Sequence, residues 1–446
     1  MLNQLMRALD PHLPSPVIAG AGDLPSVYAV SELAAASVGA AGAALSNLLP
    51  LRPHVTVDRR LASLWFQMSI RPQGWELPPV WDPVAGDYRA ADGWIRLHTN
   101  APHHRRAAER VLGFAAGSGE RAAFQRAIAG LRKADLEAAL VAAGGCAAQM
   151  FTREEWMAHA QGKAVSAEPL IATRVRAATR ALRLGPPERP LRGVRVLDLT
   201  RVLAGPVGTR FLAGYGAQVL RIDPPHWDEP GVVPEITLGK RCARLDLHRH
   251  EDRETFQALL SGADVLVHGY RPGALEGLGL GPEARRQIAP GLVDVSLCAY
   301  GYTGPWAGRR GFDSLVQMSC GIAAQGMRAA QADKPIPLPV QALDFATGYL
   351  MAAAALVGLG QRARDGRGFE ARLSLARTAE FLAGYPTASQ AQTLAPAGDA
   401  DLSPDIEHTA WGKAKRLLPP LSIDGVPMRW DLPAGPLGTS PAMWPA

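Results

Sequence analysis

The clearest pattern of hydrophobic and polar positions lies in residues 193–223. A short apolar run at 194–199 is typical of a strand that is buried on both faces. A turn follows, with Pro206 placed where the first turn of a helix tolerates proline. An apolar stripe of helical spacing and a second apolar run, which ends at Asp223, complete the segment. The pattern therefore predicts a βαβ unit with a right-handed crossover.

The same alternation of strand and helix continues along the chain. Four further elements are predicted, namely strands at 242–247, 263–267 and 292–297 and a helix at 252–260. Repeated alternation of this kind favours an α/β fold with a doubly wound, mostly parallel, Rossmann-like sheet. In such a sheet the ligand crevice lies at the carboxyl ends of the strands.

The first part of the chain has a different pattern, which indicates a smaller α+β domain. Its predicted elements are helices at 32–49, 59–66, 103–112 and 136–143 and strands at 54–58 and 93–99. The proline-rich segment 184–192 separates it from the βαβ unit. We therefore predict an N-terminal segment at 1–183, a linker at 184–192 and a Rossmann-like domain at 193–446.

Composition indicates a folded globular protein, because 47% of the 446 residues are hydrophobic. Two alanine-rich runs, at 33–49 and 345–359, approach the length of a membrane span. Charged residues, Glu32 and Asp344, precede them and their side chains are small, so buried helices are predicted and no membrane partner. The N-terminus shows no secretory signal pattern.

Cysteine spacing and charge narrow the classes of function further. The four cysteines are far apart without a CxxC pair, which indicates a reducing cytoplasm, core positions and no zinc site. The adjacent pair His103 and His104 lacks the i, i+4 spacing of metal ligands, so we predict a solvent-exposed face there. The net charge of +6 comes without a basic tail, which disfavours nucleic acid and suits a small polyphosphate ligand.

A βαβ unit that ends in an acidic residue first suggests dinucleotide binding, with Asp223 on a ribose hydroxyl. The turn does not have the G-x-G-x-x-G spacing, and Pro206 removes an amide donor where a phosphate needs one. A NAD-dependent Rossmann oxidoreductase is kept as an alternative.

Five blocks of the sequence, in order, resemble the class III CoA-transferases: LRGVRVLDLTRVLAGPVGTRFLAGYGAQVLRID, GKRCARLDL, ADVLVHGYRPGALEGLGLGPEA, GYTGPWAGRRGFDSLVQ and VQALDFATGYLMAAAALVGL. This family includes formyl-CoA transferase, carnitine CoA-transferase and alpha-methylacyl-CoA racemase. The resemblance covers about residues 191–382. Most members begin at the equivalent of Leu191, whereas the N-terminal segment here is similar to the later part of a member. The chain thus resembles a rearranged or incompletely duplicated transferase, and we expect the N-terminal segment to supply part of the same fold.

The resemblance implies a cytoplasmic transferase that moves CoA between a thioester and a carboxylic acid. The nucleophile would be Asp344, through an aspartyl anhydride and then an enzyme-bound thioester. A carboxylate is ionised at neutral pH and needs no separate base. The acyl-CoA would be a substrate, no tightly bound cofactor is implied, and members form homodimers. On spacing alone, Asp344 caps its helix.

The resemblance also places CoA beside seven residues: Val202, Ala204, Leu245, Tyr270, Arg271, Arg310 and Asp313. Where the racemase branch has a histidine, this chain has Phe312, so CoA transfer is preferred over proton transfer at an α-carbon. His268 is the nearest alternative base, and an exposed loop histidine is an equal interpretation. The altered order and phosphate contacts leave a non-catalytic CoA-binding relative as a further alternative.

An internal similarity links the two alanine-rich helices, because Glu32 opens the first as Asp344 opens the second. Strand blocks that would build a binding crevice precede Asp344 but not Glu32. We therefore predict that Asp344 is the nucleophile and Glu32 is not.

Overall fold

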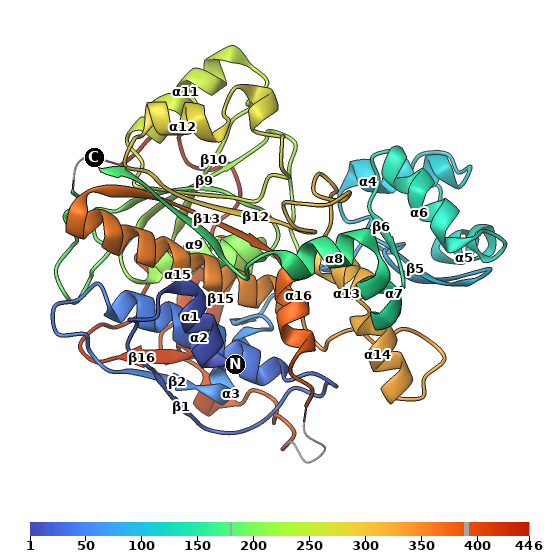
Figure 1. The fold of residues 1–446 in the computed structure, drawn as a ribbon, viewed down its shortest axis with the longest axis horizontal. Coiled ribbons are helices and arrows are strands. Elements are labelled where there is room, and N and C mark those ends of the chain that lie inside the picture. The colour runs from blue at the N-terminus through green and yellow to red at the C-terminus, as the bar shows by residue number, and fades with distance from the viewer. Residues whose placement is uncertain (179–180, 388–391, 446) are drawn as a thin grey trace.

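A central sheet organises the computed structural model, which describes residues 1–178, 181–387 and 392–445 (Figure 1). Residues 179–180 of the predicted N-terminal segment, and 388–391 and 446 of the predicted Rossmann-like domain, lie outside the described residues. Within the described part the sheet has seven strands, in the order β10 (Lys240–Arg244), β9 (Gln218–Asp223), β8 (Arg195–Leu199), β11 (Val265–His268), β12 (Val293–Cys298), β13 (Arg367–Ser374) and β7 (Ala172–Ala178). All neighbours pair in parallel except β13 and β7.

The order of the parallel strands confirms the predicted fold class. The chain runs from β8 outward through β9 to β10, then returns to β11 and continues through β12 to β13. This is the 3-2-1-4-5-6 order of doubly wound sheets, whose ligand crevice opens where the winding reverses. Here the reversal lies between β8 and β11.

Neighbouring residues of the central strands are buried on opposite faces, which explains the unbroken apolar runs. Val196 belongs to the core shared with α9 (Ala204–Gly214) and α15 (Ala342–Asp365). Leu197 belongs to the core on the other face, which α11 (His250–Ser261) and α12 (Pro282–Ile288) cover. Figure 1 shows these helix pairs on the two sides of the sheet.

A smaller lobe lies to one side of the sheet in Figure 1 and has its own core. Its antiparallel sheet comprises β4 (Gly86–Ala90), β5 (Gly93–Leu97) and β6 (Ala147–Gln149). Its helices are α4 (Pro102–Val111), α5 (Arg121–Ala129) and α6 (Lys133–Ala142). This lobe contains the predicted elements at 93–99, 103–112 and 136–143, whereas the predicted helix at 32–49 packs against α15 in the central core.

The N-terminal segment completes sheets that the rest of the chain begins. Strand β7 forms an edge of the central sheet. In two further three-stranded sheets, β2 (Val55–Asp58) pairs with β16 (Leu421–Ile423), and β3 (Ile70–Pro72) pairs with β15 (Gly412–Arg416). The expected contribution of this segment to the same fold is therefore present.

The other described elements connect these layers. The helices are α1 (Leu2–Leu9), α2 (Val30–Ser46), α3 (Arg59–Trp65), α7 (Arg153–Ala158), α8 (Ala160–Ala167), α10 (Val233–Ile236), α13 (Asp313–Ser319), α14 (Ile322–Ala329) and α16 (Leu375–Ala383). The remaining strands are β1 (Val17–Ala19) and β14 (Glu407–Thr409), and short 3₁₀ turns occur at Glu276–Leu278 and Asp399–Asp401.

The two alanine-rich helices pack against each other, α2 along α15 (Figure 1). Within the described residues, α15 is the one helix long and apolar enough to cross a membrane, and 94% of its most apolar window is buried inside the protein. It therefore serves as a core helix here. All four cysteines are free and buried, which confirms their predicted core positions.

Candidate functional site

A cleft of about 750 Å³ opens at the carboxyl ends of β8 and β11, where the strand order reverses. Thr200 and Arg201 follow β8 into its wall, and Gly269 to Arg271 follow β11. This is the position at which doubly wound sheets bind their ligands, and the volume falls in the range of ligand pockets.

Six of the eight predicted site residues line this cleft: Val202, Ala204, Tyr270, Arg271, Arg310 and Asp344. Two do not. Leu245 is buried in the core that α11 covers, and the Asp313 side chain is fully buried behind the cleft wall. The structure therefore brings together residues that lie more than 100 positions apart in the chain.

The described lining of the cleft is basic. Four arginines line it, Arg201, Arg271, Arg309 and Arg310. Among the described lining residues, Asp344 is the only carboxylate. Helix α9 also begins in the wall at Ala204, and the amides of a first helical turn lack partners within the helix. This wall suits an anionic ligand.

Arg201 is held at the mouth of the cleft by two aromatic rings. Its guanidinium carbon lies 4.6 Å from the centroid of the Trp227 ring and 5.3 Å from that of Tyr270. It also donates a hydrogen bond of 3.1 Å to the Tyr270 hydroxyl. A guanidinium fixed in this way loses little freedom when it meets a phosphate.

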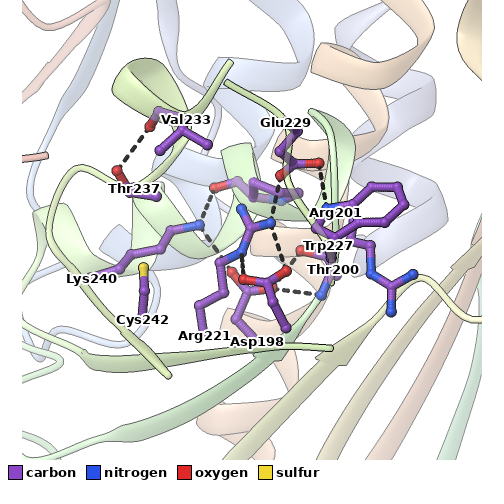
Figure 2. Close-up of polar contacts among 12 residues, drawn as sticks. Asp198, Thr200, Arg201, Arg221, Trp227, Glu229, Val233, Thr237, Lys240 and Cys242 are labelled. Carbon is purple, nitrogen blue, oxygen red and sulfur yellow. Dashed lines mark hydrogen bonds and ion pairs between the residues drawn. The ribbon is translucent and has the colours of Figure 1, made fainter. Parts of the chain in front are cut away.

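The turn after β8 contains a strained residue, Val202, whose φ is 62°. A β-branched residue in this region is an outlier, and such strain clusters at functional sites. The Val202 amide donates to Glu229 Oε2 at 2.9 Å, and Glu229 forms an ion pair with the buried Arg221. Figure 2 shows the contact between Glu229 and Arg221. Glu229 thus holds the Val202 backbone in place.

Asp223 does not serve the role that a dinucleotide site would give it. Its carboxylate is fully buried and accepts two hydrogen bonds from Arg221, at 2.8 and 2.9 Å. Because Asp223 is also absent from the lining of the cleft, it cannot reach a ribose hydroxyl. It supports Arg221 and, through it, Glu229.

A second buried ion pair fixes the start of α9. Lys240 Nζ lies 2.9 Å from Asp198 Oδ2 and donates to the Pro206 carbonyl at 2.9 Å. The Asp198 carboxylate also accepts from the Thr200 amide at 2.9 Å. Burial alone raises the pKa of Asp198, but the nearby Lys240 and Arg221 hold it below its ordinary value. The carboxylate is therefore ionised and ties strand, turn and helix together (Figure 2).

Two glycines let α15 approach this turn closely. A Cβ on Gly348 would lie 2.2 Å from the Ala204 carbonyl oxygen, and a Cβ on Gly208 would lie 2.6 Å from the Gly348 carbonyl oxygen. Neither distance is sterically allowed, so both positions require glycine. The contact brings the first turn of α15, which carries Asp344, against the start of α9.

Asp344 occupies the first turn of α15 but does not cap it. The N-cap residue is Gln341, and no side-chain capping bond is present there. Asp344 instead donates its own amide to Asp313 Oδ2 at 2.9 Å. The side chain is thus free to face the cleft, and the capping interpretation is wrong.

The environment of Asp344 changes its expected protonation. Burial and the neighbouring Asp313 carboxylate raise the pKa of Asp344 well above its usual value. Burial likewise raises the pKa of Asp313 to about 6. The simple expectation of a carboxylate that is always ionised at neutral pH is therefore wrong, and the protonation of the pair depends on pH.

A second cavity of about 220 Å³ adjoins the cleft. Four residues line both spaces: Val202, Trp227, Phe312 and Asp344. The rest of its wall comes from residues 79–82, from three residues that follow β5, from the segment 228–232, and from Leu203, Ser314 and Gln341. Asp344 therefore lies where the two spaces meet.

The histidines of the smaller lobe surround Phe312. The rings of His98 and Phe312 stack, with centroids 3.7 Å apart and planes 3° apart. Burial, followed by the charge of Arg96, lowers the pKa of His98 to about 3, so this ring is neutral. His104 is only 3% exposed and contacts Cys146 Sγ at 3.4 Å. The predicted solvent-exposed face at His103 and His104 is wrong for His104.

His268 does not form part of the site. It is the last residue of β11, is buried, and has its Nε2 3.4 Å from Asp294 Oδ1. It lines neither described cavity. His268 is therefore neither an exposed loop histidine nor a base that faces the cleft.

Sequence reasoning missed four residues that shape the site: Trp81, His98, Arg201 and Trp227. Arg201 directly follows the first strand of the winding, and its position at a carboxyl end could have identified it. The other three come from loops and from the smaller lobe, and no local pattern connects them with Asp344.

The comparisons with known proteins match part of the chain. Residues 191–406 match the sequence profile of CoA-transferase family III, which confirms the resemblance. A probable fatty acyl-CoA transferase of Mycobacterium tuberculosis is 35% identical over 194 residues, 40% of this chain and 49% of that protein. A succinyl-CoA:glutarate CoA-transferase of Mus musculus is 34% identical over 193 residues, 40% of this chain and 44% of that protein. The chain thus spans about half the length, or less, of these two relatives.

Solved structures give partial matches. A crystal structure of the Mycobacterium tuberculosis protein shows 30% identity and a TM-score of 0.39, over 44% of this chain and 58% of that one. A CaiB/BaiF family protein from Brucella suis shows 25% identity and a TM-score of 0.38, over 51% of this chain and 65% of that one.

Proposed function

We propose that this chain, whose residues 191–406 match CoA-transferase family III, transfers CoA between an acyl-CoA thioester and a carboxylic acid. One observation carries the proposal. Asp344 is the only carboxylate among the described residues that line a basic cleft, and it lies at the junction of that cleft with a second cavity. A nucleophile in this position has a polyphosphate site on one side and room for an acyl group on the other.

The chemistry proceeds at the Asp344 carboxyl group. Its oxygen attacks the thioester carbonyl carbon, the C–S bond breaks, and CoA leaves as a thiolate, which gives a mixed anhydride. The thiolate then attacks Cγ of Asp344 and releases the first acid, which leaves an aspartyl thioester. The acceptor carboxylate attacks Cγ in turn and expels the thiolate. Attack of the thiolate on the acceptor carbonyl forms the new acyl-CoA and restores Asp344.

The CoA moiety occupies the larger cleft as a substrate. Arg201, Arg271 and Arg310 lie in its wall and supply cations for phosphate groups. The start of α9 at Ala204 adds amide donors. We further propose a cytoplasmic enzyme that acts as a homodimer, as the family resemblance implies.

The oxidoreductase alternative is weakened because Asp223 is sequestered by Arg221. A non-catalytic CoA-binding relative would keep the cleft but form no covalent intermediate. The formation of a covalent intermediate, and not the binding of CoA, therefore distinguishes the two hypotheses.

The deciding experiment is mass spectrometry of the intact protein after incubation with a panel of acyl-CoAs, with hydroxylamine trapping and peptide mapping. The expected result is a hydroxamate at Asp344. A label on Glu32, or CoA binding without a covalent adduct for any donor, contradicts the proposal. Glu32 has a side chain 41% exposed and 3.4 Å from the N-terminal amine, so Glu32→Gln is the matched control.

A further inference from the structure

The second cavity differs in character from the basic cleft that it adjoins. No arginine or lysine occurs among the described residues that line it, although the cleft next to it has four arginines. Its walls are largely apolar and aromatic, with Trp81, Trp227 and Val232 among them. A ligand that enters here therefore leaves the cationic surroundings of the cleft.

The carboxylates in this wall already have partners. Asp82 forms an ion pair of 2.9 Å with Arg105, and Glu229 is paired with Arg221. Each tryptophan already contacts a guanidinium group: the guanidinium carbon of Arg96 lies 5.2 Å from the Trp81 ring centroid, and that of Arg201 lies 4.6 Å from the Trp227 ring centroid. A second negative charge would find no arginine or lysine among the described lining residues, and a positive charge would find there no unpaired carboxylate beyond Asp344 and the exposed Asp228.

Two polar atoms buried in this wall have no hydrogen-bond partner. Ser314 Oγ and His98 Nδ1 are buried and make no hydrogen bond, and both residues line the cavity. The low pKa of His98 keeps its ring uncharged. Buried polar atoms are normally hydrogen-bonded, so these two leave the wall with unused hydrogen-bonding capacity but no charge. Neither side chain therefore offers a counter-charge to a charged acyl group.

We propose that the second cavity holds the acyl group that is transferred to and from Asp344, and that it selects short, uncharged acyl groups over those with a second carboxylate. The inference rests on the proposed function and adds the substrate class. The volume of the second cavity, about 220 Å³, is below the usual range of ligand pockets, so only a short acyl chain fits. The relatives include a transferase named for glutarate, a dicarboxylic acid, so the inference separates this chain from that relative.

The test compares acceptor acids of matched length with the wild-type protein. Butyrate and succinate differ chiefly by a terminal carboxylate, and 4-(trimethylammonio)butyrate carries a positive charge instead. We expect kcat/KM for butyrate to exceed that for either charged acid by roughly a hundredfold or more, because a buried charge without a partner is strongly disfavoured. Equal or higher values for succinate or for the cationic acid overturn the inference.

A measurement without turnover keeps the inference separate from the proposed function. Calorimetry with butyrate and succinate on the CoA-loaded protein is expected to show binding of butyrate alone at millimolar concentration. If no acid pair gives turnover, the proposed function fails, and the binding result still decides the inference. Equal affinities for the two acids overturn it.

The length of the acyl chain gives a second test of the inference. Trp81→Ala should enlarge the cavity and raise the octanoate-to-butyrate ratio of kcat/KM roughly tenfold. Trp75→Ala is the matched control, since Trp75 lies in the same loop, stacks on Trp411 and lines neither cavity. An unchanged ratio in a folded Trp81→Ala protein, or the same shift in both variants, contradicts the assignment.

Discussion

The backbone N–H of Asp344 donates a hydrogen bond of 2.9 Å to Oδ2 of Asp313. Asp313 also accepts from the side chain of Gln317. The residue that the family resemblance placed beside CoA thus lies behind Asp344 and positions its backbone. Two buried carboxyl groups in this arrangement cannot both ionise without cost, so each affects the pKa of the other.

The Asp344→Asn variant should lose CoA transfer by more than ~10³-fold, because the nucleophilic oxygen is gone while the shape is kept. Its free energy of unfolding should rise. The pKa of Asp344 is raised in the folded protein, so ionisation costs stability, and that cost grows as pH rises from the unfolded-state pKa to the folded-state pKa. Thermal melts of both proteins from pH 4 to pH 8 should show a Tm difference that increases with pH. A constant difference would contradict the raised pKa.

The pH dependence of turnover should follow the same pair. The nucleophile must be ionised, so the rate rises with pH through the raised pKa of Asp344. Asp313→Asn removes the neighbouring charge and keeps an oxygen that can accept the Asp344 amide. The acid limb of kcat/KM should therefore move to lower pH. A limb that stays in place, in a variant that melts like the wild type, would show that Asp313 does not affect Asp344.

Arg271→Ala should weaken CoA binding by roughly tenfold with little change in Tm, because Arg271 is an exposed cation in the cleft wall. The affinity of the wild type should also fall as salt is added, and the variant should respond less. Arg7→Ala in α1 is the control, since Arg7 is exposed and lines neither cavity. Calorimetry measures the CoA affinity of both variants. Equal affinities of wild type and Arg271→Ala would remove Arg271 from the site.

Gly348→Ala tests the contact between α9 and α15. Its Cβ would lie 2.2 Å from the Ala204 carbonyl oxygen, so the helices must separate, at a cost of about 1–3 kcal/mol. Turnover should fall together with Tm, because Asp344 moves with the first turn of α15. Gly435→Ala is the control, because no atom lies within 4 Å of its added Cβ. Urea unfolding that shows no loss of stability for Gly348→Ala would contradict the close approach.

The fragment of residues 191–446 should be insoluble or fail to unfold cooperatively. Without residues 1–190 the central sheet loses the edge strand β7, and α15 loses its packing partner α2. The apolar face of α15 would then be exposed to water, which is strongly unfavourable. Circular dichroism melts of the fragment and of the full chain measure this. A sharp, reversible transition in the fragment would show that it folds alone.

The sequence determined the parts whose cause is local. The apolar run of 194–199, the turn with Pro206 and the following stripe specify a strand, a turn and a helix, since periodicity and turn chemistry act over neighbouring residues. Repetition of this unit was enough to predict a doubly wound sheet and a crevice at its carboxyl ends. Resemblance added Asp344, for which local spacing alone gave only a helix cap.

Tertiary structure decided what depends on contacts between distant residues. The ring that stacks on Phe312 comes from His98, and the second cavity joins Trp81 to Asp344. Residues separated by more than 200 positions leave no periodic trace of their contact. The pKa of Asp344 likewise depends on how deeply packing buries it and on how close Asp313 lies. Burial and distance in three dimensions, which no stretch of sequence encodes by itself, therefore set the chemistry of the site.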